Sequence, residues 1–475
     1  MRSSKLYSIL VKFDRYRQNR LRKFLMSPYF NRSEQLVQLF ELYVELVNET
    51  EKEYAGKENW WSILQPQKSF NDVRFRKYQS DLLRLVEYYL IQEKFEQDSV
   101  RQKDYLCESI LDEQFESLYE NSIKRLEKTI ESYPYRSSDY YYNRYLLKSR
   151  IYEIGEAKHD RKKKRPVEEV LNNIEIFSLS EKFRYTCLAL SHRAIYNYEY
   201  DIPDLNEVVK HSKIRLSDNP NLIVYYQMYL TQVDPPNEEH YFNLKNMLIK
   251  YGQLFPLKEA EFVYFSALNY CIRKINRGKE HFRIETFELY KDLLEKNILT
   301  FKGSISPWHF KNITTIGLQV GEIDWVDAFI EQYSSMIPEK FKLNAVSFNS
   351  AQVAFKRGDY SKVLRILSTV EYDDITYNLN SKAIQLMTYY ETQEIEALYS
   401  LMESFRTFLN RHKEFPARKR KSYNNLIRYT KKITKTSTNN LSDLLKIHDE
   451  IQDNPGTASI EWLREKIAER LAKAK

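Results

Sequence analysis

The densest group of chemically capable side chains is a cluster of cations towards the end of the chain. Residues 411–435 hold ten lysines and arginines against one acidic residue, a net charge of +9. Such a cluster can neutralise nucleic-acid phosphates, and Tyr423 and Tyr429 within it would offer aromatic planes for stacking on bases. The cations that we assign to this C-terminal basic patch are Arg411, Lys413, Arg418, Lys419, Arg420, Lys421, Arg428, Lys431 and Lys432.

The basic character of the chain is local. Residues 1–23 hold eight basic residues and one acidic residue, and residues 158–165 hold six and one. The formal net charge of the whole chain is nevertheless only +8, so the remaining residues are acidic on balance. Because basic helix faces often pair with acidic neighbours or only keep a protein soluble, three hypotheses stay open for the C-terminal basic patch: a nucleic acid, an acidic protein, or no ligand.

Side chains that could carry catalysis or hold a metal ion show no organising pattern. No two of the eight histidines have metal-ligand spacing on a helix, and Cys107, Cys187 and Cys271 lie far apart. The sequence holds no phosphate-binding glycine motif and no nucleophile elbow, and it has only nine glycines. Loops that cradle phosphates depend on glycine. We therefore predict a protein that is not an enzyme and that has no catalytic residue, no metal site and no cofactor.

The cysteines and the apolar runs bear on the compartment. The three cysteines form no Cys-x-x-Cys motif and no even set, which is typical of a reducing compartment. No run approaches 18 apolar residues, so we expect no membrane partner and no membrane-spanning segment. The short apolar run Leu6–Phe13 is followed by charged residues and not by a small-residue cleavage site. The sequence therefore predicts a cytoplasmic protein.

Apolar residues recur at spacings of three and four along nearly the whole chain. No alternation of period two has a useful length, and prolines and glycines fall between the helical segments. This pattern predicts an all-α fold. The expected helices include single helices over Leu6–Met26 and Leu106–Tyr133, and two separate helices over Pro166–Phe177 and Lys182–Tyr198.

A helix–turn–helix pattern recurs over residues 318–410. In its clearest copy one helix ends at Gly358, and Val363 in the next helix faces back onto the first. Equivalent small residues are expected at Ala328 and Ala397, at intervals of 35 and 34 residues. A nearly constant period in this range is typical of stacked helical hairpins, each of which packs on its neighbours.

The copy from Asn344 onward resembles a tetratricopeptide repeat. The residues that occupy the family's small, turn and packing positions are Ala351, Gly358, Asp359, Tyr360, Val363 and Leu367. The resemblance implies a right-handed α-α superhelix, a solenoid of about seven or eight hairpins. Segments 27–31 and 405–411 also look like parts of a family of uncharacterised bacterial helical proteins, and that similarity implies no activity.

The rhythm of the helices divides the chain into three expected parts. Residues 1–136 form an N-terminal helical region, residues 137–435 form the helical-repeat array, and residues 436–475 form C-terminal capping helices. The last helix, Ser459–Ala474, has one apolar face, so its polar face is expected to close the end of the array.

In tetratricopeptide proteins the first helix of each hairpin lines a concave groove that holds extended peptides or partner helices. The groove residues that the resemblance implies are Phe348, Gln352, Phe355, Lys356, Lys382, Leu386, Tyr389 and Tyr390. The aromatic residues among them could instead only fill space between helices. We therefore expect a non-enzymatic scaffold or adaptor that binds a protein or peptide partner in this groove. The alternative hypothesis is a nucleic-acid-associated regulatory protein that uses the C-terminal basic patch.

Overall fold

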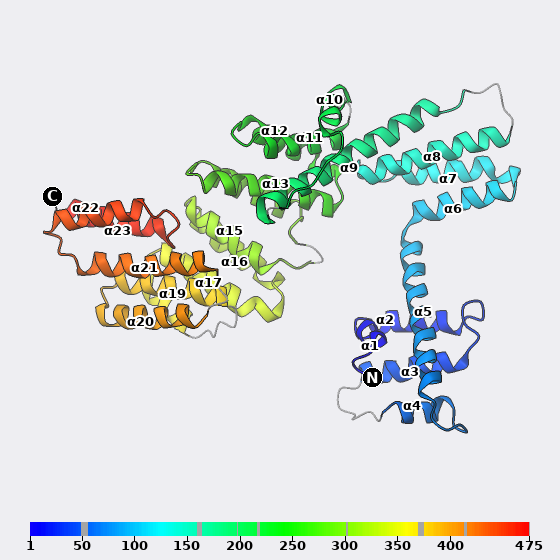
Figure 1. Cartoon of the computed structure of the whole chain (residues 1–475), viewed down its shortest axis with the longest axis horizontal. Coiled ribbons are helices and arrows are strands. Elements are labelled where there is room, and N and C mark those ends of the chain that lie inside the picture. The colour runs from blue at the N-terminus through cyan, green and yellow to red at the C-terminus, as the bar shows by residue number, and fades with distance from the viewer. Residues whose placement is uncertain are drawn as a thin grey trace. The chain divides into compact units, whose positions relative to one another are not determined.

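The computed structural model describes the chain over residues 1–48, 56–158, 164–196, 198–215, 219–300, 303–368, 375–412 and 416–474. Every regular element among these residues is a helix, and none of them lies in a strand (Figure 1). The predicted all-α class is therefore confirmed. The chain forms two compact units, Met1–Leu179 and Ser180–Lys475. The three-part division expected from the sequence stays a prediction.

The two units are built from consecutive helices. The α-helices of the N-terminal unit are α1 (Lys5–Leu10), α2 (Arg15–Met26), α3 (Glu34–Asn48), α4 (Lys57–Leu64), α5 (Asp72–Gln97), α6 (Ser99–Asp112), α7 (Tyr119–Glu131), α8 (Ser138–Ala157) and the first part of α9 (Val167–Tyr196). After α9, those of the C-terminal unit are α10 (Leu205–Arg215), α11 (Pro220–Val233), α12 (Glu239–Tyr251), α13 (Leu257–Ile275), α14 (Phe282–Glu295), α15 (Pro307–Gln319), α16 (Ile323–Tyr333), α17 (Glu339–Lys356), α18 (Tyr360–Ser368), α19 (Ile375–Glu391), α20 (Ile395–Arg411), α21 (Ala417–Lys435), α22 (Leu441–Gln452) and α23 (Ile460–Lys473). Short 3-10 turns lie at Glu116–Leu118, Gly252–Leu254 and Ser334–Met336.

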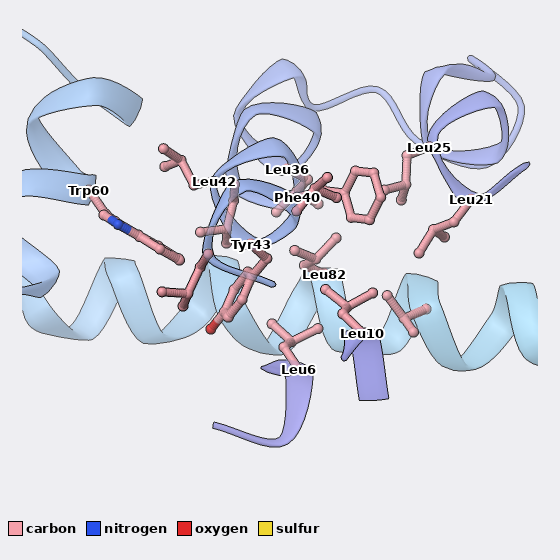
Figure 2. Packing of buried hydrophobic residues seen from close by; sticks show 14 of the residues in the cluster. Leu6, Leu10, Leu21, Leu25, Leu36, Phe40, Leu42, Tyr43, Trp60 and Leu82 are labelled. Carbon is pink, nitrogen blue, oxygen red and sulfur yellow. The ribbon is translucent and has the colours of Figure 1, made fainter. Parts of the chain in front are cut away.

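The first five helices share one apolar core. Figure 2 shows side chains of α1 to α5 meeting in it, among them Leu10, Leu25, Phe40, Trp60 and Leu82, one from each helix in order. All five are almost completely removed from solvent. Fully burying a large apolar side chain contributes about 1.5 to 3 kcal/mol. This core therefore fixes which face of α2 points inwards and which face points to solvent.

The single helix predicted over Leu6–Met26 is wrong, because the segment forms two helices, α1 and α2. Asp14 separates them: its backbone is extended, and its carboxylate accepts a hydrogen bond from the backbone N–H of Arg17 at 2.7 Å. An aspartate in this N-cap position satisfies an otherwise unpaired N–H of the new helix. The capping residue is visible in the sequence, but the surrounding apolar spacing conceals the break.

Two further helix predictions are corrected. The helix predicted over Leu106–Tyr133 is divided into α6 and α7, and Gln114 between them has a left-handed backbone with φ of 55°. In the opposite sense, the two helices predicted over Pro166–Phe177 and Lys182–Tyr198 are merged into the continuous helix α9. Residues 178–181 contain neither proline nor glycine, so no local signal ends a helix there.

A buried carboxylate ties α2 to α5. Glu93 of α5 is 8% exposed, and its carboxylate accepts hydrogen bonds from Arg17 at 2.6 Å and from the Tyr89 hydroxyl at 2.6 Å. Arg20 lies 3.6 Å from the same carboxylate. Burial by itself would raise the pKa of Glu93, but the hydrogen bonds and the two positive charges outweigh burial and hold this pKa below its ordinary value.

Because the pKa of Glu93 is lower in the folded chain, the ionised carboxylate stabilises the fold above the unfolded pKa, and this contribution is lost as the pH falls through the folded pKa. We expect protection of α2 and α5 amides from hydrogen exchange, corrected for intrinsic rates, to decrease from about pH 5 downwards. Glu93→Gln should make this protection weaker at neutral pH and less dependent on pH. Glu96→Gln is the matched control, because the Glu96 pair with Arg20 is exposed and contributes little. An identical pH dependence in Glu93→Gln and wild type would contradict the assignment.

The later helices of the C-terminal unit pack as consecutive hairpins. Helix pairs α15–α16, α17–α18 and α19–α20 each pack together, and α15, α17, α19 and α21 contact one another in that order (Figure 1). Gly317 allows the close approach of α15 and α16, because a Cβ atom at this position would collide with Val326. Helices packed in neighbouring pairs are compatible with a helical-repeat protein.

Three turns of these hairpins have the same hydrogen bonds. Gly321, Gly358 and Gln393 each have a positive φ, of 90°, 77° and 60°. At each turn the backbone N–H of the next residue donates to the carbonyl four residues before the positive-φ position, at 3.0, 2.9 and 3.0 Å. Glycine adopts this backbone with least strain, which explains the first two positions. The helix–turn–helix pattern predicted at Gly358 is therefore present.

The same turns correct the residues that we matched to Val363. The backbone N–H of Val363 donates to the carbonyl of the residue directly after the positive-φ position, and Val326 and Leu398 do the same in their hairpins. All three side chains are fully buried, whereas Ala328 is exposed and Ala397 is half-buried. Ala328 and Ala397 are therefore not the equivalents of Val363. The structural intervals are 37 and 35 residues, in place of 35 and 34.

None of the helices in the described part of the chain combines the length and the apolar character that crossing a membrane requires.

Candidate functional site

A cavity of about 940 Å³ lies along the helices that come first in the hairpins of the C-terminal unit. Residues of α15, α17 and α19 line it, and α14, α18, α21 and α23 add to its walls. Five of its lining residues are aromatic: Phe348, Phe355, Tyr360, Tyr423 and Trp462. Ligand sites typically have volumes of about 300 to 1,000 Å³ and apolar walls with a few polar groups. This cavity has that size and character.

The structure brings together the four groove residues predicted on α17. Phe348, Gln352, Phe355 and Lys356 all line the cavity, because their spacing of four, seven and eight residues places them on one helix face. Phe348 is buried, Gln352 and Phe355 are half-buried, and Lys356 is exposed. The Phe355 ring lies 5.6 Å from the ring of Tyr360 on α18. Within the described residues, Lys356 has no acidic partner in an ion pair.

The groove residues predicted on α19 do not line the cavity. Leu386 is fully buried, and Tyr389 and Tyr390 are half-buried. The Lys382 ammonium lies 5.6 Å from the Phe408 ring of α20, and burial lowers the pKa of Lys382. The α19 residues that do line the cavity are Asn380, Ala383, Ile384, Met387 and Glu391.

This difference has the same origin as the misplaced alanines. We transferred positions from α17 to α19 with an interval of 34 residues, but their turns at Gly358 and Gln393 are 35 residues apart. One residue along an α-helix rotates a side chain by about 100°, because a turn holds 3.6 residues. The interval of 35 residues converts Phe348, Gln352 and Lys356 to Ala383, Met387 and Glu391, which do line the cavity. It converts Phe355 to Tyr390, which packs on Trp462 and does not line the cavity.

Helix α23 forms one wall of the cavity, and the sequence did not predict its contacts. The Trp462 ring packs edge-on against Tyr390 of α19 with centroids 5.3 Å apart, and the indole N–H donates to Glu391 Oε1 at 2.7 Å. Lys466, one helical turn after Trp462, places its Nζ 3.1 Å from the same oxygen. Helix α23, which we expected to close the end of the array, is therefore tied to α19 beside the cavity.

Lys466 is a buried cation, with a side chain 8% exposed. It lies 3.0 Å from Glu465 and 2.8 Å from Glu469, in addition to Glu391. Burial by itself would lower the pKa of Lys466, but hydrogen bonds to the three carboxylates hold this pKa above its ordinary value. The ammonium is therefore charged at neutral pH, and the contact between α19 and α23 is ionic as well as aromatic.

The remaining charged side chains of the cavity carry both signs. Arg283 of α14 lies 3.8 Å from Glu461 of α23, which adds a second tie to that helix. Arg357 at the edge points towards α16, where it pairs with Asp324 at 2.8 Å and with Asp327. The charged lining of the cavity is therefore of both signs, and part of it is already paired.

The aromatic rings that we assigned to the C-terminal basic patch are buried in the fold and not exposed beside its cations. Tyr423 is 7% exposed, and its hydroxyl donates to Asn380 Oδ1 at 2.6 Å. Burial raises the pKa of Tyr423 to about 12. Tyr429 is completely buried, and its hydroxyl donates to the Glu450 carbonyl at 3.0 Å. The prediction that these two rings stack on bases is therefore wrong.

The cations of the C-terminal basic patch have different environments. Lys432 lies 2.6 Å from Glu450 and Lys431 lies 3.8 Å from Glu403, so acidic neighbours neutralise part of the patch. Lys419 lines the cavity, Arg420 is half-buried, and Lys413 lies outside the described residues. The exposed members are Arg411, Arg418, Lys421 and Arg428. Nucleic-acid binding by this patch stays a hypothesis.

The described side chains include no group of three or more His, Cys, Asp or Glu residues arranged to hold a metal ion. In comparisons with known proteins, the chain matches no protein-family model, no curated protein and no solved structure. The function must therefore be argued from the geometry of the cavity itself.

Proposed function

We propose that this chain is a non-enzymatic, tetratricopeptide-like superhelical scaffold that binds a segment of a partner protein in the cavity beside α17. One observation carries the proposal. One face of α17, from Phe348 to Lys356, and Trp462 of α23 line the same cavity, whose volume is about 940 Å³. A helix face that only filled space between neighbours would leave no such volume, because protein interiors are closely packed.

The lining of the cavity supports a peptide ligand. Its aromatic side chains can bury the apolar side chains of a partner segment, and aromatic residues are enriched where proteins bind each other. The side-chain amides of Gln319, Gln352 and Asn380 also line it. Side-chain amides can donate hydrogen bonds to the backbone of an extended segment and accept hydrogen bonds from it. These bonds replace the ones that the backbone loses to water when the segment binds. A cytoplasmic location belongs to the same proposal, since Cys107 and Cys271 are buried free thiols.

Phe355→Glu is the variant that tests the proposal. Phe355 is only half-buried, so a carboxylate can reach solvent in the free chain, but a bound apolar segment would have to bury it. Burying an unpaired charge is costly, so we expect recovery of the partner from a native lysate to fall at least about tenfold. The measurement is quantitative mass spectrometry of proteins captured by wild-type and variant chains.

Phe341→Glu provides the matched control. Phe341 lies on the same helix, is 42% exposed, and does not line the cavity. We expect this variant to recover the partner as the wild type does. Equal recovery by Phe355→Glu and wild type, or an equal loss in both variants, would contradict the proposed site.

A further inference from the structure

Helix α2 presents an unusual set of side chains to solvent. Arg15, Tyr16, Asn19, Lys23 and Met26 are all exposed, with Tyr16 at 72% and Met26 at 64%. With 3.6 residues per turn, these five positions fall within an arc of about 100°. The opposite side of the helix is held in the N-terminal core, where Figure 2 shows Leu21 and Leu25. We call these five residues the α2 outer face.

Positive charge around this face is not neutralised. The other three arginines of α2 are paired: Arg17 with Glu93, Arg20 with Glu93 and Glu96, and Arg22 with Glu41. Arg22 also donates a hydrogen bond to Asn19 Oδ1 on this face. Six other cations in residues 1–33 are exposed and have no acidic partner among the described residues: Arg2, Lys5, Lys12, Arg15, Lys23 and Arg32. The paired arginines hold the fold together, whereas the six unpaired cations are open to a ligand. A surface with unpaired positive charges attracts a polyanion.

We propose that α2 is a recognition helix for double-stranded DNA, with its outer face in the major groove. A helix with its side chains is about 10 to 12 Å wide, and the major groove of B-DNA is about 12 Å wide. Arg15 and Asn19 lie in the first five residues of α2, which is the part of a recognition helix that reaches base edges. Arginine pairs with guanine and asparagine with adenine through two hydrogen bonds each.

The helix before α2 fits the same arrangement. Helix α1 ends at Leu10 and α2 begins at Arg15, so a four-residue turn joins them. A turn of this length joins the two helices of the reading unit in many DNA-binding proteins, although α1 makes its main contacts with α3 and α5. Lys5 of α1 and Lys12 of the turn are exposed, and with Lys23 they can contact phosphates on either side of the groove.

Other polyanions fit this face less well. A helix that lies on an anionic membrane needs an apolar stripe towards the lipid, but Asn19 stands near the centre of the α2 outer face. The major groove of double-stranded RNA is too narrow for a helix. DNA binding by α2 does not depend on the cavity of the C-terminal unit, so the DNA-binding proposal and the partner-binding proposal can fail separately.

The test measures binding of the full chain to a fluorescent DNA duplex of about two helical turns and mixed sequence, by anisotropy at several salt concentrations. Arg15→Ala with Lys23→Ala should weaken binding at least about tenfold and lower the salt slope by about 2, one for each lost phosphate or base contact. Arg125→Ala with Lys128→Ala is the matched control: both residues are exposed on α7 and the charge change is the same. The control should bind as the wild type does.

A second variant separates the recognition of bases from the electrostatic attraction to phosphates. Asn19→Ala changes no charge, so it should keep the salt slope but lose about tenfold in affinity for duplexes that the wild type selects from a random pool. Several outcomes would overturn the inference: no DNA binding at about 50 mM salt, equal affinity for an RNA duplex of the same sequence, or an equal loss in the control. Binding only to vesicles of phosphatidylglycerol and phosphatidylcholine would overturn it too. So would a loss caused by Arg418→Ala with Lys421→Ala and not by the α2 variant.

Discussion

Trp462→Ala is expected to destabilise the docking of α23 by about 3 to 5 kcal/mol, the usual cost of truncating a buried tryptophan. Trp462 is 9% exposed, its ring packs on Tyr390, and its indole N–H donates to Glu391. The ring contact, the hydrogen bond and the buried apolar surface are lost together, and space is left beside the cavity. Hydrogen exchange should therefore rise across α22 and α23 while α15 and α16 keep their protection.

Trp462→Phe separates the ring contact from the hydrogen bond. A phenyl ring can still pack on Tyr390 but cannot donate to Glu391, so this variant should lose only about 1 to 2 kcal/mol. Two results would contradict the assigned contact: equal exchange of α23 amides in wild type and Trp462→Ala, or a loss of protection spread evenly over the C-terminal unit.

Lys466→Met is expected to destabilise the same docking by about 3 kcal/mol, because removing one member of a buried ion pair leaves the other charge without compensation. The side chains of Lys466 and Glu391 are 8% and 15% exposed. Adding Glu391→Gln to Lys466→Met removes the stranded charge and should recover a large part of the loss. The measurement is again the exchange of α23 amides, read as a free energy of opening.

Lys446→Met on the neighbouring helix α22 is the matched control. Lys446 is 72% exposed and pairs with Asp443 at 3.3 Å, so its loss should cost no more than about 1 kcal/mol. The buried network would be refuted if Lys446→Met and Lys466→Met had equal effects, or if Glu391→Gln worsened the double variant.

The sequence predicts the helices better than their boundaries. Apolar spacing of three and four residues is enough for an all-α prediction, since such residues must share one helix face. Boundaries depend on single residues: Asp14 caps a new helix within an apolar pattern, and Gln114 interrupts the helical pattern without glycine or proline. The left-handed backbone of Gln114 depends on its surroundings and cannot be read from its residue type.

The candidate site could be predicted only where it is local. The four residues predicted on α17 all line the cavity because one helix period relates them. The residues predicted on α19 do not line it, because we matched Val363 to the small residue Ala397, while the hydrogen bonds of the turn match it to Leu398. Trp462 lies 71 residues after Glu391, and no local pattern reports a contact between side chains so far apart in the chain.

A photo-crosslinking measurement tests the partner-binding cavity most directly. A photoreactive benzoylphenylalanine replaces Gln352, which lines the cavity, or Arg365, which is exposed on α18 and does not line it. We expect one partner to crosslink from position 352 and not from position 365, and this crosslink to disappear when Phe355→Glu is added. A partner that crosslinks equally from both positions, or a crosslink from position 352 that survives Phe355→Glu, would contradict binding in the cavity.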